Sequence, residues 1–316
     1  MTATYPDVMS GAHACAVAVS DEHRWEITSA FITAGLVRDE CVVYFDDDTI
    51  DRVLDRLADD RVPVAGPLAD GQLSIISTDD TRALMRTPVA HVQKVLGNAI
   101  DESLAQGYTG MRMTGQFSYA LTRPGGVALH EYCDGLDMVL EGRPARVLCL
   151  FDPRRFSDDD IERLRRQHRE EFTAAAVYDD ALLRITRTGQ SQARLAGEVD
   201  HSNRPMIARL LENILDESLR SHSASTDLTL DLATLRFLDV AGAVSLVHAA
   251  EQFPSTHRLV LSSVRPRVLR VLDRCGAPFA AQLVLTSHPG FANSDANQAD
   301  ANQADASETD ASEVES

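Results

Sequence analysis

Residues 227–250, DLTLDLATLRFLDVAGAVSLVHAA, contain the pattern that decides the fold of the second half of the chain. Apolar and polar residues alternate over 228–232, which predicts a strand, and a second apolar piece follows at 235–238. A helix is expected to begin at Asp239, because an aspartate at this position accepts hydrogen bonds from the free N–H groups of the first turn. A helix N-terminus also favours negative charge, so the turn is a natural place for a phosphorylated serine or a docking partner.

The length and composition are those of a globular protein with room for two domains. The chain has 316 residues, of which 44% are hydrophobic and 25% are charged. No apolar run approaches the roughly 20 residues that a membrane span requires, and the N-terminus lacks the basic region of a signal peptide. Five cysteines are scattered without C-x-x-C spacing, which predicts buried free thiols in a reducing cytoplasm.

The acidic charge of the chain limits its partners. Its 48 aspartate and glutamate residues exceed its 30 lysine and arginine residues, which gives a formal charge of −18. Proteins that bind nucleic acid use basic side chains to neutralise phosphates, so direct binding to nucleic acid is not expected. An anionic membrane surface would repel the chain for the same reason.

Residues 1–178 form the first predicted domain. In this block, short apolar runs of strand length alternate with segments of helical period. Buried strands that alternate with helices are typical of a parallel sheet covered on both faces, so we assign the block to the α/β class. The expected strands are 14–19, 40–45, 73–77, 111–114 and 145–151, and the expected helices are 24–36, 49–58, 89–106, 129–141 and 158–177.

Residues 179–288 form the second predicted domain, a mixed sheet with helices packed against it. Besides the segment quoted above, strands are expected at 181–187, 192–198, 258–262 and 282–286, and helices at 205–218 and 266–275. The third piece, 289–316, contains the unit DANQA twice, with many acidic and almost no apolar residues. It cannot bury enough surface to offset its ordering entropy, so we predict a disordered acidic tail.

The order of elements at the start of the chain resembles the core of a P-loop ATPase. A working phosphate cradle needs G-x-x-x-x-G-K-[ST], because the glycines let backbone N–H groups face the phosphates and the lysine contacts them. The corresponding loop at 20–24, SDEHR, has neither glycine nor lysine, and its two carboxylates would repel a nucleotide. We therefore expect no ATP hydrolysis, no enzymatic activity and no cofactor.

Four segments of the first block together resemble the MEDS family of sensory domains in bacterial and archaeal regulators. They read HACAVAVS, FITAGLVRDECVVYFDDD, HEYCDGLDMVL and ARVLCLFDPRRF, and the resemblance covers nearly all of 1–178. It implies a degenerate ATPase-like fold that senses a ligand or partner, with small hydrocarbon derivatives as one hypothesis for the ligand.

The carboxyl ends of parallel strands nominate the residues that would line a ligand pocket in this block. Those residues are Ser20, His23, Asp46, Asp47, Thr114, Gln116 and Asp152, and His13 joins them because it matches the early histidine of the MEDS family. Asp152 also stands where a metal-binding aspartate lies in true ATPases. A zinc site built from His13, Cys15, His23 and Cys41 lacks the close paired spacing of zinc ligands, so no metal is expected.

Three segments of the second block resemble the STAS domain of anti-sigma factor antagonists. They are GEVDHSNRPMI at 197–207, LTLDLATLRFLDVAGAVSLVHA at 228–249 and LVLSSVRPRVLRVLDRCG at 259–276, in this order and at plausible spacing. The resemblance implies a surface that faces an anti-sigma factor or a related serine kinase. It assigns to this partner-binding surface Asp200, Asn203, Asp231, Asp239, Val240, Ala241 and Gly242.

The turn after Asp239 departs from the STAS pattern. In the phosphorylated members a kinase modifies a serine in this turn, and the added charge breaks docking by repulsion and desolvation. The matching positions here are Val240 and Ala241, so no phosphosite is expected, and Ser245, one helical turn further on, would face differently. The domain is then either permanently competent to bind and regulated by the first block, or a scaffold that binds other STAS domains.

The leading hypothesis is a cytoplasmic signalling regulator of two domains. The first block would sense a ligand or partner, and the STAS-like block would engage an anti-sigma factor. Because no DNA-binding helix-turn-helix segment is recognised, an effect on transcription would pass through another protein. Two alternatives stay open: a scaffold that assembles larger complexes, and a nucleotide-using enzyme, which the loop at 20–24 disfavours.

Overall fold

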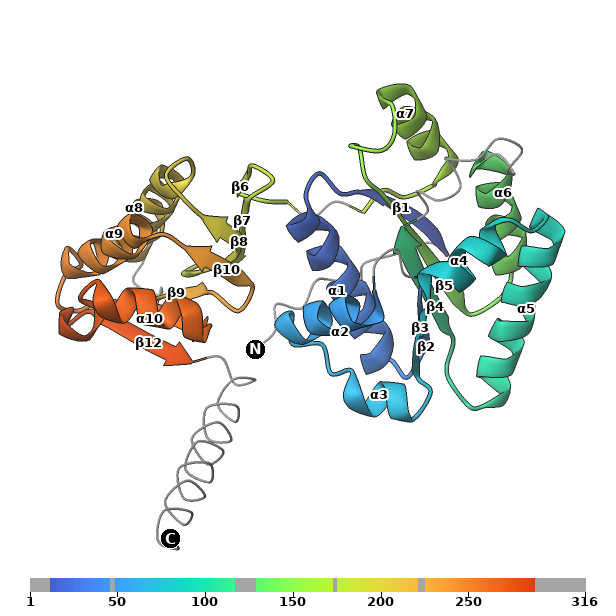
Figure 1. The fold of residues 1–316 in the computed structure, drawn as a ribbon, viewed down its shortest axis with the longest axis horizontal. Coiled ribbons are helices and arrows are strands. Elements are labelled where there is room, and N and C mark those ends of the chain that lie inside the picture. Colours follow the sequence, from blue (N-terminus) through green and yellow to red (C-terminus); the bar gives the residue numbers. More distant parts are fainter. Residues whose placement is uncertain (1–11, 46–48, 117–128, 173–174, 221–224, 288–316) are drawn as a thin grey trace, which may run out of the picture. The chain divides into compact units, whose positions relative to one another are not determined.

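A computed structural model of the chain describes residues 12–45, 49–116, 129–172, 175–220 and 225–287. The chain divides into two compact units between Ala175 and Ala176, and each is described by itself (Figure 1). Among the described residues, no helix is both long enough and apolar enough to cross a membrane.

A parallel sheet of five strands forms the centre of the first unit. Along the sheet the strands follow the order β1-β5-β4-β2-β3, and every neighbouring pair is parallel. The strands are β1 (His13–Val17), β2 (Cys41–Phe45), β3 (Leu73–Ile76), β4 (Met111–Gln116) and β5 (Ala145–Phe151). All five residues of β2 and all six of β4 are buried, as expected for strands covered on both faces.

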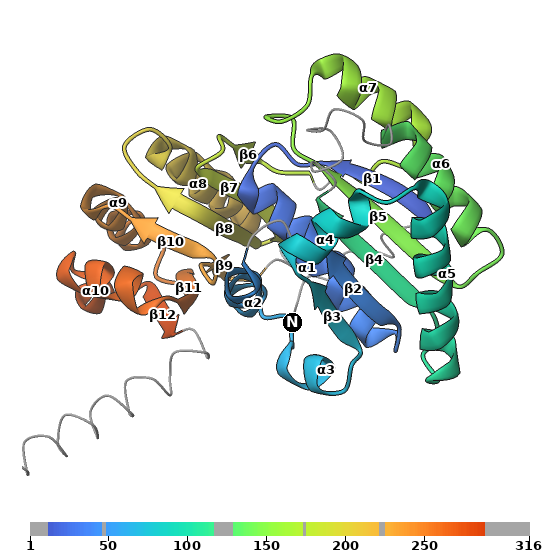
Figure 2. The same ribbon diagram turned by 45° about the vertical axis from the view of Figure 1, so that its right-hand side comes forward.

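Helices cover both faces of this sheet (Figure 2). One face packs against α4 (Thr78–Met85), α5 (Val89–Ala105), α6 (Leu129–Leu140) and α7 (Asp158–Gln167). The other packs against α1 (Asp21–Val37) and α2 (Ile50–Asp59), and the short α3 (Ala65–Ala69) precedes β3. Because side chains alternate along a strand, Ala14 and Ala16 of β1 face α1, whereas Cys15 faces α6 and α7.

The first sheet also buries a charged group. Arg112 in β4 is almost fully buried, and its Nε donates to Glu40, whose second oxygen accepts from Nη1 of Arg146 at 2.8 Å. The Arg112 side chain passes so close to α1 that a Cβ at Gly35 would lie 2.8 Å from its Cδ. A glycine is therefore required where α1 crosses this ion pair.

A mixed sheet forms the centre of the second unit, and the α-helices of this unit pack against it in one apolar core. The strand order is β12-β11-β9-β8-β7-β6, and β10 pairs with β8. The strands are β6 (Tyr178–Asp179), β7 (Leu183–Gly189), β8 (Gln192–Val199), β9 (Asp227–Asp231), β10 (Leu235–Leu238), β11 (Arg258–Val264) and β12 (Leu283–Ser287). β7 is antiparallel to both of its neighbours, β6 and β8, and the other pairs are parallel. The helices α8 (Arg204–Arg220), α9 (Val240–Glu251) and α10 (Pro266–Arg274) share one apolar cluster with the sheet, and a 3₁₀ turn at Ala277–Phe279 follows.

The predicted fold class, a parallel α/β unit followed by a mixed sheet with helices, is confirmed. The prediction of one helix over 158–177 is wrong, because α7 ends at Gln167. The imidazole of His168 caps it through a hydrogen bond between Nδ1 and the carbonyl of Leu164 at 2.8 Å. The backbone at 170–172 then runs along the open side of β1 and exchanges two hydrogen bonds with Cys15. The predicted tail, 289–316, lies outside the described residues.

Smaller differences trace to local capping. α1 begins at Asp21 rather than at 24, because the hydroxyl of Ser20 accepts a hydrogen bond from the N–H of His23 at 3.1 Å. The helix α4 was not predicted from the sequence, and the hydroxyl of Ser77 caps it in the same way. The predicted strand at 181–187 begins later, at Leu183, because Ala181 has a positive φ of 71°.

Removing the carboxylate of Glu40 should destabilise the first unit strongly. Glu40→Ala leaves the buried guanidinium of Arg112 without its counter-ion, so we expect a loss of about 3–5 kcal/mol in the free energy of unfolding. Urea unfolding followed by the fluorescence of Trp25, the chain's single tryptophan and a buried residue of this unit, measures it. Asp101→Ala, which removes the exposed partner of Arg143, should cost at most about 1 kcal/mol. Equal losses in the two variants would contradict the prediction.

Candidate functional site

Two strands bring the predicted partner-binding loops together in the second unit. β8 and β10 are parallel neighbours in which Val199 lies opposite Leu238. The N–H of Asp239 donates to the carbonyl of Val199 at 3.1 Å, so the loops that follow the two strands begin side by side. Asp200 and Asp239 are the first residues of these loops, and both are partly exposed.

Asp239 is the N-cap of α9, as predicted from the sequence. Its Oδ1 accepts a hydrogen bond from the N–H of Gly242 at 2.6 Å, and its Oδ2 lies 3.6 Å from Nε of Arg204. Arg204 also donates to the carbonyl of Asp200 at 3.3 Å and so links the two loops. A Cβ at Gly242 would lie 2.9 Å from Asp239 Oδ1 and 3.0 Å from a methyl group of Val199, which explains the glycine.

Apolar side chains are exposed around the start of α9. The exposed fractions are 49% for Phe237, 65% for Val240 and 48% for Val244. We call Phe237, Val240, Ala241 and Val244 the apolar patch. Ala241 is exposed as well, and Ser245 on the same helix donates its hydroxyl hydrogen to the carbonyl of Ala241 at 2.8 Å.

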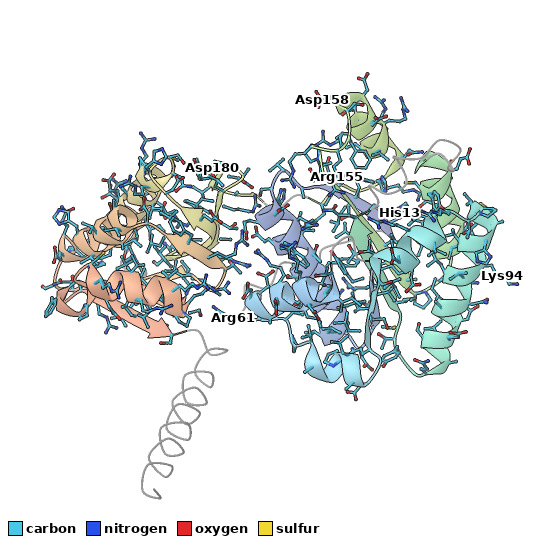
Figure 3. The ribbon with its side chains drawn as sticks, viewed as in Figure 1. His13, Arg61, Lys94, Arg155, Asp158 and Asp180 are labelled. Atoms are coloured by element: carbon cyan, nitrogen blue, oxygen red, sulfur yellow. The ribbon has the colours of Figure 1, made fainter. Side chains whose placement is uncertain are left out.

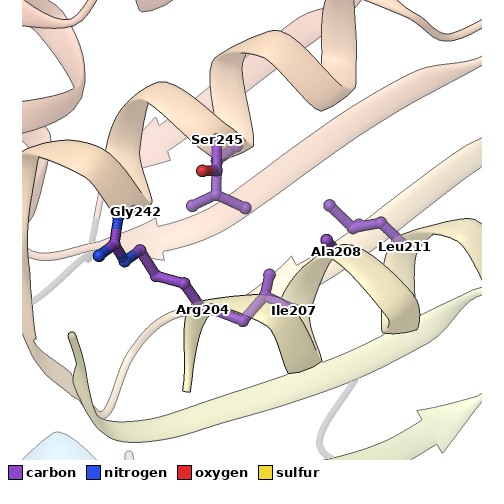
Figure 4. Close-up of a pocket in the computed structure, with 7 residues that line it drawn as sticks. Arg204, Ile207, Ala208, Leu211, Gly242 and Ser245 are labelled. Carbon is purple, nitrogen blue, oxygen red and sulfur yellow. The ribbon is translucent and has the colours of Figure 1, made fainter. Parts of the chain in front are cut away.

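A shallow groove runs between α8 and α9 beside the capped turn (Figure 4). Arg204 stands at one end of it and extends toward Gly242. The remainder of the lining is mostly apolar and comprises Ile207, Ala208, Leu211, Ser245 and Leu246. The groove therefore continues the surface formed by the two loops.

The structure separates the seven predicted partner-binding residues into three groups. Asp200, Asp239, Val240 and Ala241 share the surface of the two loops. Asn203 and Gly242 are buried; the Asn203 side chain bonds the N–H of Asp200 and the carbonyl of Glu198, so it shapes the loop from inside. Asp231 lies opposite Arg194 of β8, five residues before Val199, so it stands roughly 16 Å from the loops along the strand.

The candidate ligand-binding residues of the first unit mostly lie at the carboxyl edge of its sheet. Ser20 and His23 follow β1, Thr114 and Gln116 end β4, and Asp152 follows β5. These five side chains are buried. Asp46 and Asp47 lie outside the described residues.

Asp152 is already engaged by an arginine. Arg154 donates to both of its carboxylate oxygens, at 2.9 and 2.8 Å, and reaches Asp21 at 2.8 Å. Although burial opposes it, this hydrogen bonding holds the pKa of Asp152 below its ordinary value. Asp152 is therefore held in an Asp–Arg–Asp network that joins the start of α1 to the loop after β5.

His13 lies apart from the other candidates, at the start of β1, and is buried in the first unit (Figure 3). It belongs to a buried cluster that we call the Cys/His cluster: His13, Cys15, Cys133, Cys149 and His168. The rings of His13 and His168 meet edge to face, with centroids 4.4 Å apart. His23 and Cys41, the other two residues considered as zinc ligands in the sequence, lie elsewhere. His23 follows β1, and Cys41 begins β2.

The Cys/His cluster changes the acidity of its members. Hydrogen bonding to Cys149, and then to His168, lowers the pKa of the Cys133 thiol to about 6 against the opposing effect of burial. Burial lowers the pKa of His168, but hydrogen bonds to Cys133 and Cys15 outweigh it and raise that pKa to about 10. The sequence does not single out Cys133, Cys149 and His168 as site residues, because they are far apart in the chain and show no ligand spacing.

The comparisons with known proteins assign a family model to each unit. The model described as MEthanogen/methylotroph, DcmR Sensory domain (MEDS) matches residues 12–169, which is half of the chain. The STAS domain model matches residues 185–288. Both predicted resemblances are thereby confirmed.

Solved structures also match, and curated proteins do not. The flagellar accessory protein FlaH from Methanocaldococcus jannaschii is similar over 59% of this chain and 78% of its own, with 9% identity and a TM-score of 0.43. A search of the curated proteins found no match.

Loss of the cap on α9 should loosen its first turn. Asp239→Ala removes the acceptor for Gly242 N–H and should cost about 1 kcal/mol, which makes amide hydrogen exchange at the start of α9 about fivefold faster. Asp239→Asn keeps an oxygen acceptor and should leave the rate almost unchanged. Hydrogen-exchange mass spectrometry of the full chain distinguishes the two variants, and equal acceleration in both would show that charge rather than capping holds the turn.

Proposed function

Because the chain belongs to the MEDS family and carries a STAS domain after its MEDS domain, we propose that it is an anti-sigma factor antagonist-like regulator. The two domains together indicate a signalling or regulatory role. In our proposal, the STAS unit binds an anti-sigma factor or a related serine kinase, and the MEDS unit receives the input. The protein would act by binding in the cytoplasm and not as an enzyme.

The apolar patch beside a capped helix N-terminus is the observation that carries this proposal. Protein interfaces have an apolar centre and a polar rim, and a few anchors supply most of the binding energy. Phe237, Val240 and Val244 provide apolar anchors, and the carboxylates of Asp200 and Asp239 stand on the rim. An apolar pocket bordered by basic groups would complement this surface, because the rim charges steer association.

The lack of a hydroxyl in the turn supports constitutive binding competence. Phosphorylation would place about two negative charges on the apolar patch and oppose docking by desolvation and repulsion. Val240 and Ala241 occupy these positions and cannot carry phosphate. In this proposal the STAS unit stays in its binding-competent form, and regulation enters through the MEDS unit.

The loops at the carboxyl edge of the first sheet support an input role without nucleotide chemistry. Asp21 and Glu22 stand where a phosphate cradle needs glycines, and their carboxylates are already paired with Arg154 and Arg56. Arg154 also pairs with Asp152. We propose that a small molecule or partner is sensed near Ser20, His23 and Gln116. Such an input acts only through different affinities for two states of the protein.

A charge in the centre of the apolar patch should abolish partner binding. Val240→Asp places a carboxylate where an apolar pocket is expected, so the affinity for a purified anti-sigma factor kinase should fall at least about 100-fold, as for loss of an interface anchor. Isothermal titration calorimetry with the full chain measures it. Leu219→Asp is the matched control, because Leu219 is 53% exposed and lies at the far end of α8 from Arg204.

Two outcomes would contradict the proposed partner. Unchanged affinity in Val240→Asp would exclude the apolar patch as the docking surface. If the unaltered chain binds no anti-sigma factor kinase but forms oligomers that Val240→Asp dissociates, the patch is a scaffold contact between STAS units.

A further inference from the structure

The Cys/His cluster gathers its side chains from four separate segments. Cys15 and Cys149 are register partners in the neighbouring strands β1 and β5, so they lie side by side on the same face. His13 precedes Cys15 by two residues and therefore faces the same way. Cys133 comes from α6, which packs on this face, and His168 directly follows α7.

Each imidazole presents Nε2 to a sulfur atom and directs Nδ1 to an oxygen. His13 Nδ1 lies 3.0 Å from Oδ1 of Asp137, and its Nε2 lies 3.3 Å from Sγ of Cys149. His168 Nδ1 lies 2.8 Å from the carbonyl oxygen of Leu164, and its Nε2 lies 3.8 Å from Sγ of Cys133. Because a carbonyl oxygen only accepts, Nδ1 of His168 carries a hydrogen.

Metal-binding histidines have the same two contacts, one from each ring nitrogen. A histidine ligand usually donates its second ring N–H to a carboxylate or a backbone carbonyl, which fixes the ring and the tautomer. Asp137 provides the carboxylate for His13, and Leu164 provides the carbonyl for His168. In both residues the nitrogen left over is Nε2, and in both it faces a thiol.

The nitrogen–sulfur separation within each His–Cys pair fits two ligands of one metal ion. With Zn–S near 2.3 Å and Zn–N near 2.05 Å, a nitrogen and a sulfur ligand of the same ion lie about 3.6 Å apart. The two observed separations, 3.3 Å and 3.8 Å, lie on either side of this value. Ligand atoms of His13, Cys149 and His168 also lie within 4.8 Å of one another, and Cys133, which lies outside this group of three, approaches it through His168.

We propose that the first unit binds a thiophilic d¹⁰ cation, with Zn²⁺ as the preferred ion, through Cys133, Cys149 and the Nε2 atoms of His13 and His168. Binding displaces two protons to solvent, one from Cys149 Sγ and one from the hydrogen-bonded pair of Cys133 Sγ and His168 Nε2, and forms two metal–sulfur and two metal–nitrogen bonds. Two thiolates then balance the double charge of the ion, so the buried centre is neutral overall. Neutrality matters because each of the four side chains is at most 7% exposed.

The cation would fasten α6 and the end of α7 to the strands β1 and β5. Metal affinity becomes folding free energy when the ligands come from segments that separate on unfolding. This inference concerns the interior of the MEDS unit and does not depend on which partner the STAS unit binds.

Cobalt(II) is a suitable probe, because its visible bands report tetrahedral geometry and its near-ultraviolet bands report bound thiolate. The reduced full-length protein should bind one Co²⁺ with both signals, and Zn²⁺ should displace it. Cys149→Ser should lose the thiolate signal and the tight site. Cys41→Ser, which alters a buried cysteine of the same sheet outside the cluster, should keep both. Titration with Cu⁺ then shows whether it competes with Zn²⁺ for the same site.

A variant outside the ligand set keeps the test valid if a ligand variant fails to fold. Asp137→Ala removes only the acceptor of His13, and its side chain is 51% exposed, so the fold should survive. The affinity for Zn²⁺ should fall about 10–100-fold, as for loss of an outer-sphere partner. Asp134→Ala, an exposed aspartate of the same helix, should bind like the unaltered protein.

Three results would overturn the metal site. The first is Co²⁺ bound without a thiolate band, and the second is equal affinity in Asp137→Ala and Asp134→Ala. The third is a Cys133–Cys149 disulfide, which lowers the mass of the protein by two hydrogens, together with no metal binding once that disulfide has been reduced. That third result would assign the cluster to thiol redox chemistry instead.

Discussion

The register between parallel neighbouring strands is the constraint on which both candidate sites depend. In the second unit, Val199 opposite Leu238 makes the two following loops start at the same level, so Asp200 and Asp239 share a surface. In the first unit, Cys15 opposite Cys149 places two thiols together on the face that α6 and α7 cover. A shift of one residue in either pair would turn these side chains to the opposite face of the sheet. The same packing that closes each core therefore also positions its polar groups.

The two sites treat buried polarity in different ways. Around α9, the polar groups serve the backbone: Asp239 caps the helix, Arg204 links two loops and Asn203 holds one of them from inside, which leaves the apolar patch for a partner. In the Cys/His cluster, thiols and imidazoles occupy core positions where aliphatic side chains would pack without needing polar partners. Each ring nitrogen there meets an oxygen or a sulfur atom. Burying these polar groups lowers the stability of the core compared with aliphatic side chains. A ligand bound by both the sulfur and the nitrogen atoms would account for the arrangement.

Features that depend on neighbouring residues could be predicted from the sequence, and contacts between distant segments could not. The alternation at 228–232 and the cap at Asp239 identified β9 and the start of α9, because both depend on residues within one turn or strand. The helix predicted over 158–177 was wrong because backbone pairing of 170–172 with β1 overrides the helical composition. Asp231 was grouped with Asp200 by the resemblance to STAS domains, and no local signal gives the register of β8 against β9 that sets the two residues apart. His13 was recognised only by family resemblance, and its partners Cys149 and His168 lie on segments that only the fold brings together.

The free energy that a bound input can supply limits how far it can shift the state of the chain. With no hydroxyl in the turn after Asp239, switching of the STAS unit needs free energy from elsewhere in the chain. Moving a two-state equilibrium from 1:99 to 99:1 takes about 5.5 kcal/mol of differential binding. A ligand present at a hundred times its Kd for one state, and not bound by the other state, supplies about 2.7 kcal/mol. The same relation holds for a cation in the Cys/His cluster and for a molecule at the carboxyl edge of the sheet, because only the ratio of concentration to Kd enters. Either input at that concentration could therefore switch the chain only if its two states were already close in free energy.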